Sequence, residues 1–127
     1  MRIIVFVKHV KYVYAQTGPD PKTNNIGPDD VIRIINPLDE LAVEVALKIK
    51  DRDRSTEVIA VSLGDRFAAE GIRKSLEMGA DKGIHVLFDK YDELDSWATA
   101  IVLAQLARQV RFQLILCGRE AIDTNTG

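Results

Sequence analysis

The sequence is poor in the residues that build disulfides and metal centres. It contains one cysteine, Cys117, so no disulfide can form within these residues, and its two histidines, His9 and His85, give no zinc-ligand spacing. A formal net charge of −2 gives no electrostatic case for binding nucleic acid or an anionic membrane. The apolar runs are too short for a signal peptide or a membrane-spanning helix, so we expect a soluble cytoplasmic protein without membrane insertion.

The motifs of common nucleotide-dependent enzymes and hydrolases are missing as well. There is no G-x-G-x-x-G dinucleotide fingerprint, no G-x-x-x-x-G-K-[ST] phosphate loop and no G-x-S-x-G nucleophile elbow. No residues group as a nucleophile with its base. We therefore expect no catalytic residue and no metal site, which argues against a hydrolase with a self-contained active site.

Apolar runs alternate with amphipathic segments along most of the chain. With 127 residues, 46% of them hydrophobic, residues 1–127 suffice for one globular domain with a substantial core. The pattern predicts strands at 2–7, 57–63, 83–88 and 112–117, and helices at 36–51, 65–78 and 93–110. Residues 8–35 are rich in Gly, Pro, Asn and Asp and predict an excursion, in which 31–35 can form half of an irregular hairpin.

The predicted helices carry end signals and apolar faces. Asn36 suits the N-cap of the first helix, Asp65 suits the N-cap of the second, and Gly79 suits a left-handed end. The expected buried face of the first helix is Leu38, Leu41, Ala42, Val45, Ala46 and Ile49. The third helix has two apolar stripes, one of Trp97, Ile101 and Ala104, the other of Ala98, Val102, Leu106 and Val110. Either a partner or additional core can cover so wide a surface.

The alternation of strands and helices predicts an α/β fold with a doubly wound parallel sheet in the order 3-2-1-4. The chain direction reverses between the first and fourth strands, and ligands of open α/β sheets bind outside the carboxyl ends of the strands at such a point. The loops after Val7 and Cys117 meet there. We expect Cys117 to be a small buried hydrophobe, His9 a loop residue and His85 structural.

Three features near this point can bind a ligand. The segment 123–127 offers hydroxyls and backbone N–H groups to a phosphate, although an ordinary helix-capping loop has the same composition. The helix start at Asn36 has acids in its first turn, so it suits a ribose or an adenine edge better than a phosphate, or it is only a well-capped helix. Lys8 follows the first strand and can contact a phosphate or a flavin, or be an ordinary surface lysine.

Five segments together resemble the β subunit of electron transfer flavoproteins: "VFVKHV", "INPLDELAVEVALKIKD", "EVIAVSLG", "SLEMGADKGIHV" and "LILCGREAIDTNTG". The combination of NP-x-DE-x-AVE-x-AL, MGAD-x-x-IHV and G-x-x-AID-x-x-TG is highly specific. The resemblance implies an adenine-nucleotide α-hydrolase-like domain in a heterodimer with an α subunit that carries the redox FAD. It also implies an electron carrier, rather than a stand-alone catalyst, that passes electrons from flavin dehydrogenases to an acceptor.

The same resemblance implies where a nucleotide binds. It places adenylate contacts at Phe6, Asn36, Leu38, Asp39 and Leu63. It places phosphate contacts at Asp123, Thr124, Asn125, Thr126 and Gly127. The implied ligand is AMP, or a second FAD in the electron-bifurcating members.

The chain departs from the family pattern at a few positions. The family commonly has a small residue where Phe6 stands, and "GREAID" replaces a frequent "GKQAID", which adds the charges of Arg119 and Glu120. Asn125 replaces a frequent Asp, which removes a negative charge near the phosphates. Because family members are about twice as long, we expect this sequence to be the N-terminal half of a longer polypeptide.

Two rival interpretations have different requirements. A nucleotide-sensing module of the universal-stress type needs G-x-x-G at the last loop, and Ala121 stands where the second glycine would be. An ATP-pyrophosphate-splitting enzyme of the same fold group needs "SGGxDS" after the first strand, where this chain has "KHVKYVY".

Overall fold

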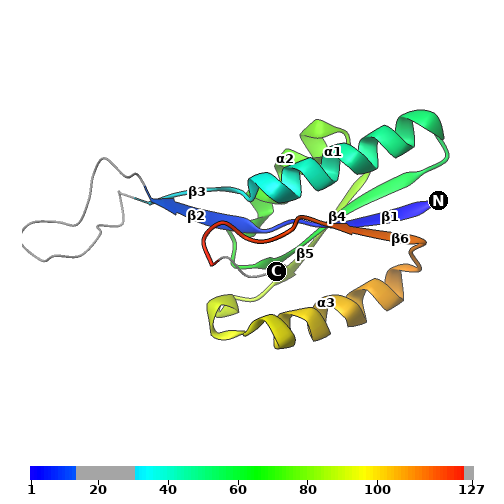
Figure 1. Cartoon of the computed structure of the whole chain (residues 1–127). Helices are drawn as coiled ribbons and strands as arrows, with labels where there is room; N and C mark the ends of the chain where they lie inside the picture. The colour runs from blue at the N-terminus through cyan, green and yellow to red at the C-terminus, as the bar shows by residue number, and fades with distance from the viewer. Residues whose placement is uncertain (14–30, 125–127) are drawn as a thin grey trace, which may run out of the picture.

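The computed structural model describes residues 1–13 and 31–124, and residues 14–30 and 125–127 lie outside the described part (Figure 1). Its strands are β1 (Arg2–Phe6), β2 (His9–Val13), β3 (Val31–Ile35), β4 (Glu57–Gly64), β5 (Lys82–Leu87) and β6 (Leu114–Cys117). Its helices are α1 (Pro37–Arg52), α2 (Ala68–Met78) and α3 (Ser96–Val110), with a 3-10 turn, η2, at Tyr91–Glu93. The order of these elements agrees with the predicted alternation.

Four parallel strands form the central sheet in the order β5-β4-β1-β6, which confirms the predicted order 3-2-1-4. Strand β1 lies between β4 and β6, so that Phe6 aligns with Val61 on one side and with Cys117 on the other. Helices α1 and α2 cover one face of the sheet and α3 covers the other (Figure 1). This arrangement is a doubly wound α/β fold, and the carboxyl ends of β1 and β6 lie side by side where the chain direction reverses.

Strand β1 is buried on both of its faces. Ile3 and Val5 pack with Val43 on the α1 side of the sheet, and Ile4 packs with Ala107 on the α3 side. Ile3, Ile4 and Val5 are all 0% exposed, so none of these three central positions can be polar, whereas Arg2 at the start of the strand is partly exposed. This is why an uninterrupted apolar run, rather than an alternating one, encodes the strand.

The buried face of helix α1 overlaps the predicted one only in part: Ala42, Ala46 and Ile49 pack in the core as predicted. Val43 and Ala46 are fully buried and Leu47 packs against their cluster, whereas Leu41 and Val45 are 56% and 47% exposed. Apolar residues lie around much of this helix, so their spacing alone does not show which side meets the sheet. The prediction is wrong at Leu41 and Val45, and it missed Val43 and Leu47.

Asp65 was predicted to be the N-cap residue of α2, and this prediction is wrong. The N-cap residue is Phe67, and Asp65 accepts the Phe67 N–H through Oδ1 at 3.0 Å and the Ala68 N–H through its carbonyl at 3.0 Å. Asp65 therefore organises the turn before the helix. Gly79 ends α2 with a φ of +129°, a backbone conformation that favours glycine and that the sequence had indicated.

Helix α3 begins at Ser96, later than predicted, because Asp95 caps it by accepting the Ala98 N–H at 2.7 Å. The α3 side chains that pack against the sheet are Leu103, Leu106, Ala107 and Val110. Trp97 and Ile101 of the predicted first stripe are 75% and 44% exposed, so that stripe lies outside the core. In the part of the chain that the structure describes, no helix combines the length and the hydropathy needed to cross a membrane.

Strands β2 and β3 form an antiparallel hairpin between β1 and α1, with His9 opposite Ile35. The predicted strand at 31–35 is confirmed, but His9 is the first residue of β2 and not a loop residue. The Asn36 N–H donates to the Lys8 carbonyl at 2.8 Å next to the last pair of the ladder. The hairpin therefore brings the residue after β1 next to the residue before α1.

We predict opposite effects on stability from the same substitution at Gly83 in β5 and Gly71 in α2. A Cβ at Gly83 would overlap the Ile72 side chain, so Gly83→Ala should lower the free energy of unfolding by about 1–3 kcal/mol. A Cβ at Gly71 would meet nothing nearer than Ile35 Cγ1 at 4.0 Å, so Gly71→Ala should raise it by about 0.5–1 kcal/mol through helix propensity. Urea denaturation measures both, and equal stabilities would contradict the packing described here.

Candidate functional site

A cavity of about 1270 Å³ opens at the carboxyl ends of β1, β4 and β6 and extends along the first half of α3. Its apolar wall is made of Phe6, Val61, Leu63, Ala100, Leu103, Ala104 and Ile115. Its polar side contains Lys8, Lys11, Asp39, Asp92, Asp95, Glu120, Asp123 and Thr124. The cavity lies at the topological reversal between β1 and β6, where the sequence had predicted a ligand.

The segment after β6 forms one wall of the cavity, and Asn36 holds it in place. The Asn36 side chain donates from Nδ2 to the Glu120 carbonyl at 2.8 Å, and its Oδ1 accepts the Ile122 N–H at 3.1 Å. Asn36 precedes α1 and is 1% exposed. Asn36 occupies the N-cap position as predicted, but its side chain makes no capping hydrogen bond to α1 and instead bonds the distant loop.

Asp39 joins the loops that follow β1 and β6. One carboxylate oxygen, Oδ2, accepts the Lys8 N–H at 2.8 Å, and the other, Oδ1, accepts the Gly118 N–H at 3.2 Å. Burial raises the pKa of Asp39 above its usual 3.8, although the N–H groups of Lys8 and Gly118 and the Asn36 side chain counteract part of this rise. The four bonds from Asn36 and Asp39 to backbone groups are called the loop clasp below.

The loop clasp requires glycine at position 118. A Cβ there would lie 2.8 Å from the Asp39 backbone nitrogen and 2.8 Å from the Leu38 carbonyl carbon. Real Cβ atoms do not come this close to backbone, so the chain after β6 can approach the start of α1 only where a side chain is absent. The glycine of "LILCG" is explained by close approach rather than by an unusual backbone angle.

Lys8 and Asp123 form an ion pair across the cavity mouth. The Lys8 Nζ lies 3.0 Å from Asp123 Oδ1, and the Lys11 backbone N–H donates to Asp123 Oδ2 at 3.4 Å. The two side chains are 32% and 17% exposed, so the pair is partly shielded from solvent. Asp123 thus connects the last described loop to the start of the hairpin.

Cys117 lines the cavity and is exposed, which corrects the expectation of a buried hydrophobe. It is the last residue of β6, an edge strand of the sheet, so one side of it faces the opening. Partial burial raises the pKa of its thiol, and the nearby Asp39 carboxylate raises it further. A raised pKa keeps the sulfur protonated at neutral pH, which makes it a poor nucleophile.

The structure brings together six of the predicted site residues. Those that line the cavity are Phe6, Lys8, Asp39, Leu63, Asp123 and Thr124. Asn36 and Leu38 adjoin the cavity at the start of α1 without lining it, and Asn36 acts on its wall through the loop clasp. Asn125, Thr126 and Gly127 lie outside the described residues.

Helix α3 contributes to this cavity, which was not predicted from the sequence. Ala100, Leu103 and Ala104 form much of the apolar wall, opposite the strand ends. The signal was present in the small residues near the start of the helix, which leave room beside the sheet. No local pattern distinguishes such alanines from those of an ordinary packed helix.

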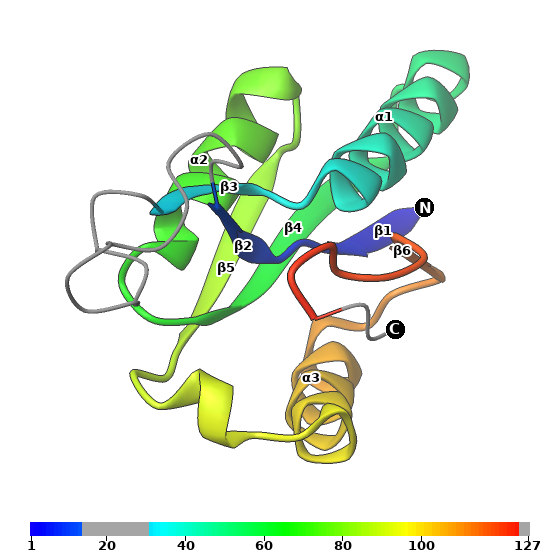
Figure 2. The same cartoon turned by 60° about the vertical axis from the view of Figure 1, so that its left-hand side comes forward.

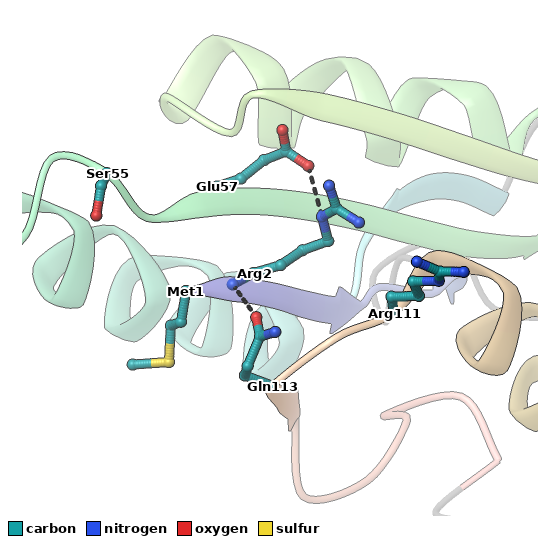
Figure 3. Close-up of a pocket in the computed structure, with 6 residues that line it drawn as sticks. All are labelled: Met1, Arg2, Ser55, Glu57, Arg111 and Gln113. Carbon is teal, nitrogen blue, oxygen red and sulfur yellow. Dashed lines mark hydrogen bonds and ion pairs between the residues drawn. The ribbon is translucent and has the colours of Figure 1, made fainter.

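A second hollow, of about 490 Å³, lies at the opposite end of β1 (Figure 3). It is lined by Met1, Arg2, Ser55, Glu57, Arg111 and Gln113. The Arg2 Nε lies 3.0 Å from Glu57 Oε1, and the Arg2 backbone N–H donates to Gln113 Oε1 at 2.6 Å, so the chain's own groups occupy these polar atoms. None of the residues predicted to bind a ligand lines it, and the larger cavity remains the candidate site.

Comparison with known proteins gives a consistent result. The model of the electron transfer flavoprotein domain matches residues 26–127. The chain is 41% identical over 128 residues to the caffeyl-CoA reductase-Etf complex subunit CarD of Acetobacterium woodii, covering 99% of this chain and 48% of that protein. It is 38% identical to the human electron transfer flavoprotein subunit beta, covering 97% of this chain and 49% of that protein. The Dictyostelium discoideum subunit beta is 36% identical, with 97% and 48% covered. The chain spans about half the length of these curated relatives.

We predict that Asp39→Asn changes the pH dependence of stability in a defined direction. Because its pKa in the folded state is above 3.8, Asp39 stays protonated up to a higher pH in the folded state than in the unfolded state. Its contribution to stability therefore falls as pH rises from 3.8 through the folded pKa, and is unaffected below 3.8. The free energy of unfolding of the wild type should decline relative to Asp39→Asn across this window, as measured by denaturation at a series of pH values.

Asp81→Asn provides the control with the opposite sign. Partial desolvation raises the pKa of Asp81, but bonds from the Lys50 Nζ and the Val58 N–H outweigh it and hold the pKa below 3.8. Its stabilisation is present above 3.8 and is lost as pH falls through the lower folded pKa. If the difference in the free energy of unfolding between wild type and variant changed with pH in the same direction for Asp39→Asn and Asp81→Asn, the burial of Asp39 would be contradicted.

Proposed function

The chain belongs to the electron transfer flavoprotein family, and from this premise we propose that it forms part of an electron-carrier subunit of the β type. Electron transfer of this kind needs a protein that positions a flavin and tunes its surroundings, while the flavin itself carries the electrons. The proposed partner is an electron transfer flavoprotein α subunit, in a heterodimer that collects electrons from flavin dehydrogenases. The proposed location is the cytoplasm.

The observation that carries the proposal is the cavity at the reversal between β1 and β6. We propose that it binds the adenosine part of a nucleotide against its apolar wall, with Phe6 and Leu63 beside the base, and that Asn36, Leu38 and Asp39 support this part of the site from the start of α1. Its volume of about 1270 Å³ exceeds the range of about 300–1,000 Å³ that is usual for small-ligand sites. A whole nucleotide therefore has room, even with Phe6 in place of a smaller residue.

The charges around the cavity restrict where phosphates can lie. The described lining contains two lysines, Lys8 and Lys11, and five acids. An anion is therefore favoured only beside the lysines and the segment from Asp123, and is repelled near Asp92 of η2 and Asp95, the N-cap residue of α3. We propose phosphate contacts at Lys8, at Asp123 and Thr124, and at the three residues that follow, Asn125, Thr126 and Gly127.

Lys8 can contact a phosphate without giving up Asp123. An ammonium group has three N–H donors, and its pairing with Asp123 at 3.0 Å uses one direction. The ion pair also neutralises a carboxylate that would otherwise repel the phosphate. The proposed ligand is AMP, or FAD if the protein bifurcates electrons; AMP supplies no redox chemistry, whereas FAD accepts and releases electrons.

The released small molecules provide the direct test. The protein is purified at its natural length with its co-purifying partner and denatured, and the supernatant is analysed by chromatography and mass spectrometry. We expect one FAD and one AMP per heterodimer, or two FAD without AMP if the site holds a flavin. Release of no flavin, or of ATP alone, would contradict an electron carrier and favour a nucleotide-sensing module.

A cavity-filling variant ties the nucleotide to this cavity. Ala104 lines the apolar wall, so Ala104→Trp should occlude it and reduce the retained adenine nucleotide by about tenfold or more. Gln105 is the next residue of α3, is exposed, and is not part of the lining, so Gln105→Trp is the matched control. Quantifying the nucleotide released per protein in both variants decides the point; equal retention would place the nucleotide elsewhere.

A further inference from the structure

We propose that Asn36 and Asp39 are positioning residues, which set the affinity for the phosphate part of the nucleotide by holding the loop after β6 rather than by bonding the nucleotide. This inference rests on the proposed function, since it assumes that a nucleotide occupies the cavity. It differs from the direct adenylate contacts implied by family resemblance. The loop clasp carries the argument.

The Asn36 amide bonds the loop through both its nitrogen and its oxygen. It donates to the Glu120 carbonyl at 2.8 Å and accepts the Ile122 N–H at 3.1 Å, so it bonds alternate residues of the loop as a neighbouring strand would. The residue is 1% exposed and does not line the cavity. A nucleotide could bond this amide only by displacing the loop that forms the wall of its own site.

Asp39 uses both carboxylate oxygens in the same way. The oxygens accept the N–H groups of Lys8 and Gly118, at 2.8 and 3.2 Å, from loops at the carboxyl ends of two neighbouring strands. Bonds from N–H groups to a carboxylate are about twice as strong as those between neutral groups. Because one carboxylate holds both loops, the position of Lys8 relative to the loop after β6 is fixed at this point.

The clasp therefore orders the segment that leads into Asp123 and Thr124. Residues 118–122 are held at Gly118, Glu120 and Ile122, and Asp123 is paired with Lys8. A ligand that meets an ordered loop does not lose affinity to the entropy of ordering it. If the clasp is weakened, the phosphate contacts should weaken while the apolar wall for the base is unchanged.

Two substitutions each exchange one atom type without changing side-chain shape. Asp39→Asn replaces one acceptor by an NH₂ group that faces a backbone N–H, so one of its two bonds is lost. Asn36→Asp replaces the donor to Glu120 by an oxygen that faces the carbonyl, and it also adds a negative charge beside Asp39. Because Asp39→Asn removes a negative charge, which by itself would favour an anion, its loss of AMP affinity is the deciding result. Glu40→Gln is the control, because it removes the same charge as Asp39→Asn from the same first turn of α1.

The ligand pair of AMP and adenosine separates positioning from direct contact. Both are titrated into nucleotide-stripped protein of natural length with its partner, and dissociation constants are measured by calorimetry. For Asp39→Asn and Asn36→Asp we expect AMP to weaken by about tenfold and adenosine by less than about twofold, with Glu40→Gln unchanged. Equal losses for both ligands would overturn the inference in favour of direct contacts with the ribose or base.

A measurement on the wild type covers the case in which the variants fail to fold. Amide hydrogen exchange without nucleotide should show protection at Lys8, Gly118 and Ile122, and rapid exchange there would contradict a preformed clasp. Wild-type protein that binds neither AMP nor adenosine would contradict the proposed function itself. If the wild type binds both AMP and adenosine, and the folded variants bind AMP as tightly as the wild type does, only the positioning role of Asn36 and Asp39 is contradicted.

Discussion

A carboxylate and an amide at the start of α1 determine how the ends of β1 and β6 are arranged. Asp39 and Asn36 are both buried, and both bond backbone groups of segments distant in sequence, with Asn36 and Glu120 separated by 84 positions. A buried polar side chain without partners is costly, so the fold must bring these loops to the helix. The shape of the cavity follows, because the segment after β6 forms one of its walls. Figure 2 shows this segment, coloured red, on the same side of the sheet ends as α3.

This arrangement changes the electrostatic description of the cavity. Two of its five acids, Asp39 and Asp123, are engaged by the protein's own donors, the first by backbone N–H groups and the second by Lys8. Their charge is therefore less available to repel an anion than a count of side chains suggests. The remaining acids are Asp92 in η2, Asp95 at the start of α3 and Glu120 in the loop after β6, so the cavity is polarised, with its cationic part close to the end of β1.

The sheet order and the position of the cavity could be predicted because local periodicity gives the order of strands and helices, and general rules of α/β topology give the rest. The faces of α1 and α3 were predicted only in part, since apolar residues such as Leu41 and Val43 lie on different sides of α1 and only the packed sheet selects between them. The members predicted correctly are Ala42, Ala46 and Ile49 of α1 and Leu106 and Val110 of α3. Asn36 illustrates the same limit at the site. Its identity fits a helix cap, and only the folded chain shows that its amide bonds a loop near the other end of the sequence.

The hairpin of β2 and β3 has a consequence for how this protein tolerates changes in length. Its ladder from His9–Ile35 to Val13–Val31 closes the excursion before the chain reaches α1. The entropy of closing a loop grows only with the logarithm of its length, about 0.6 kcal/mol per doubling. The β2–β3 ladder already pairs Val13 with Val31. Insertions or deletions between these two residues should therefore change stability little and leave Lys8 and Asn36 in place beside the cavity.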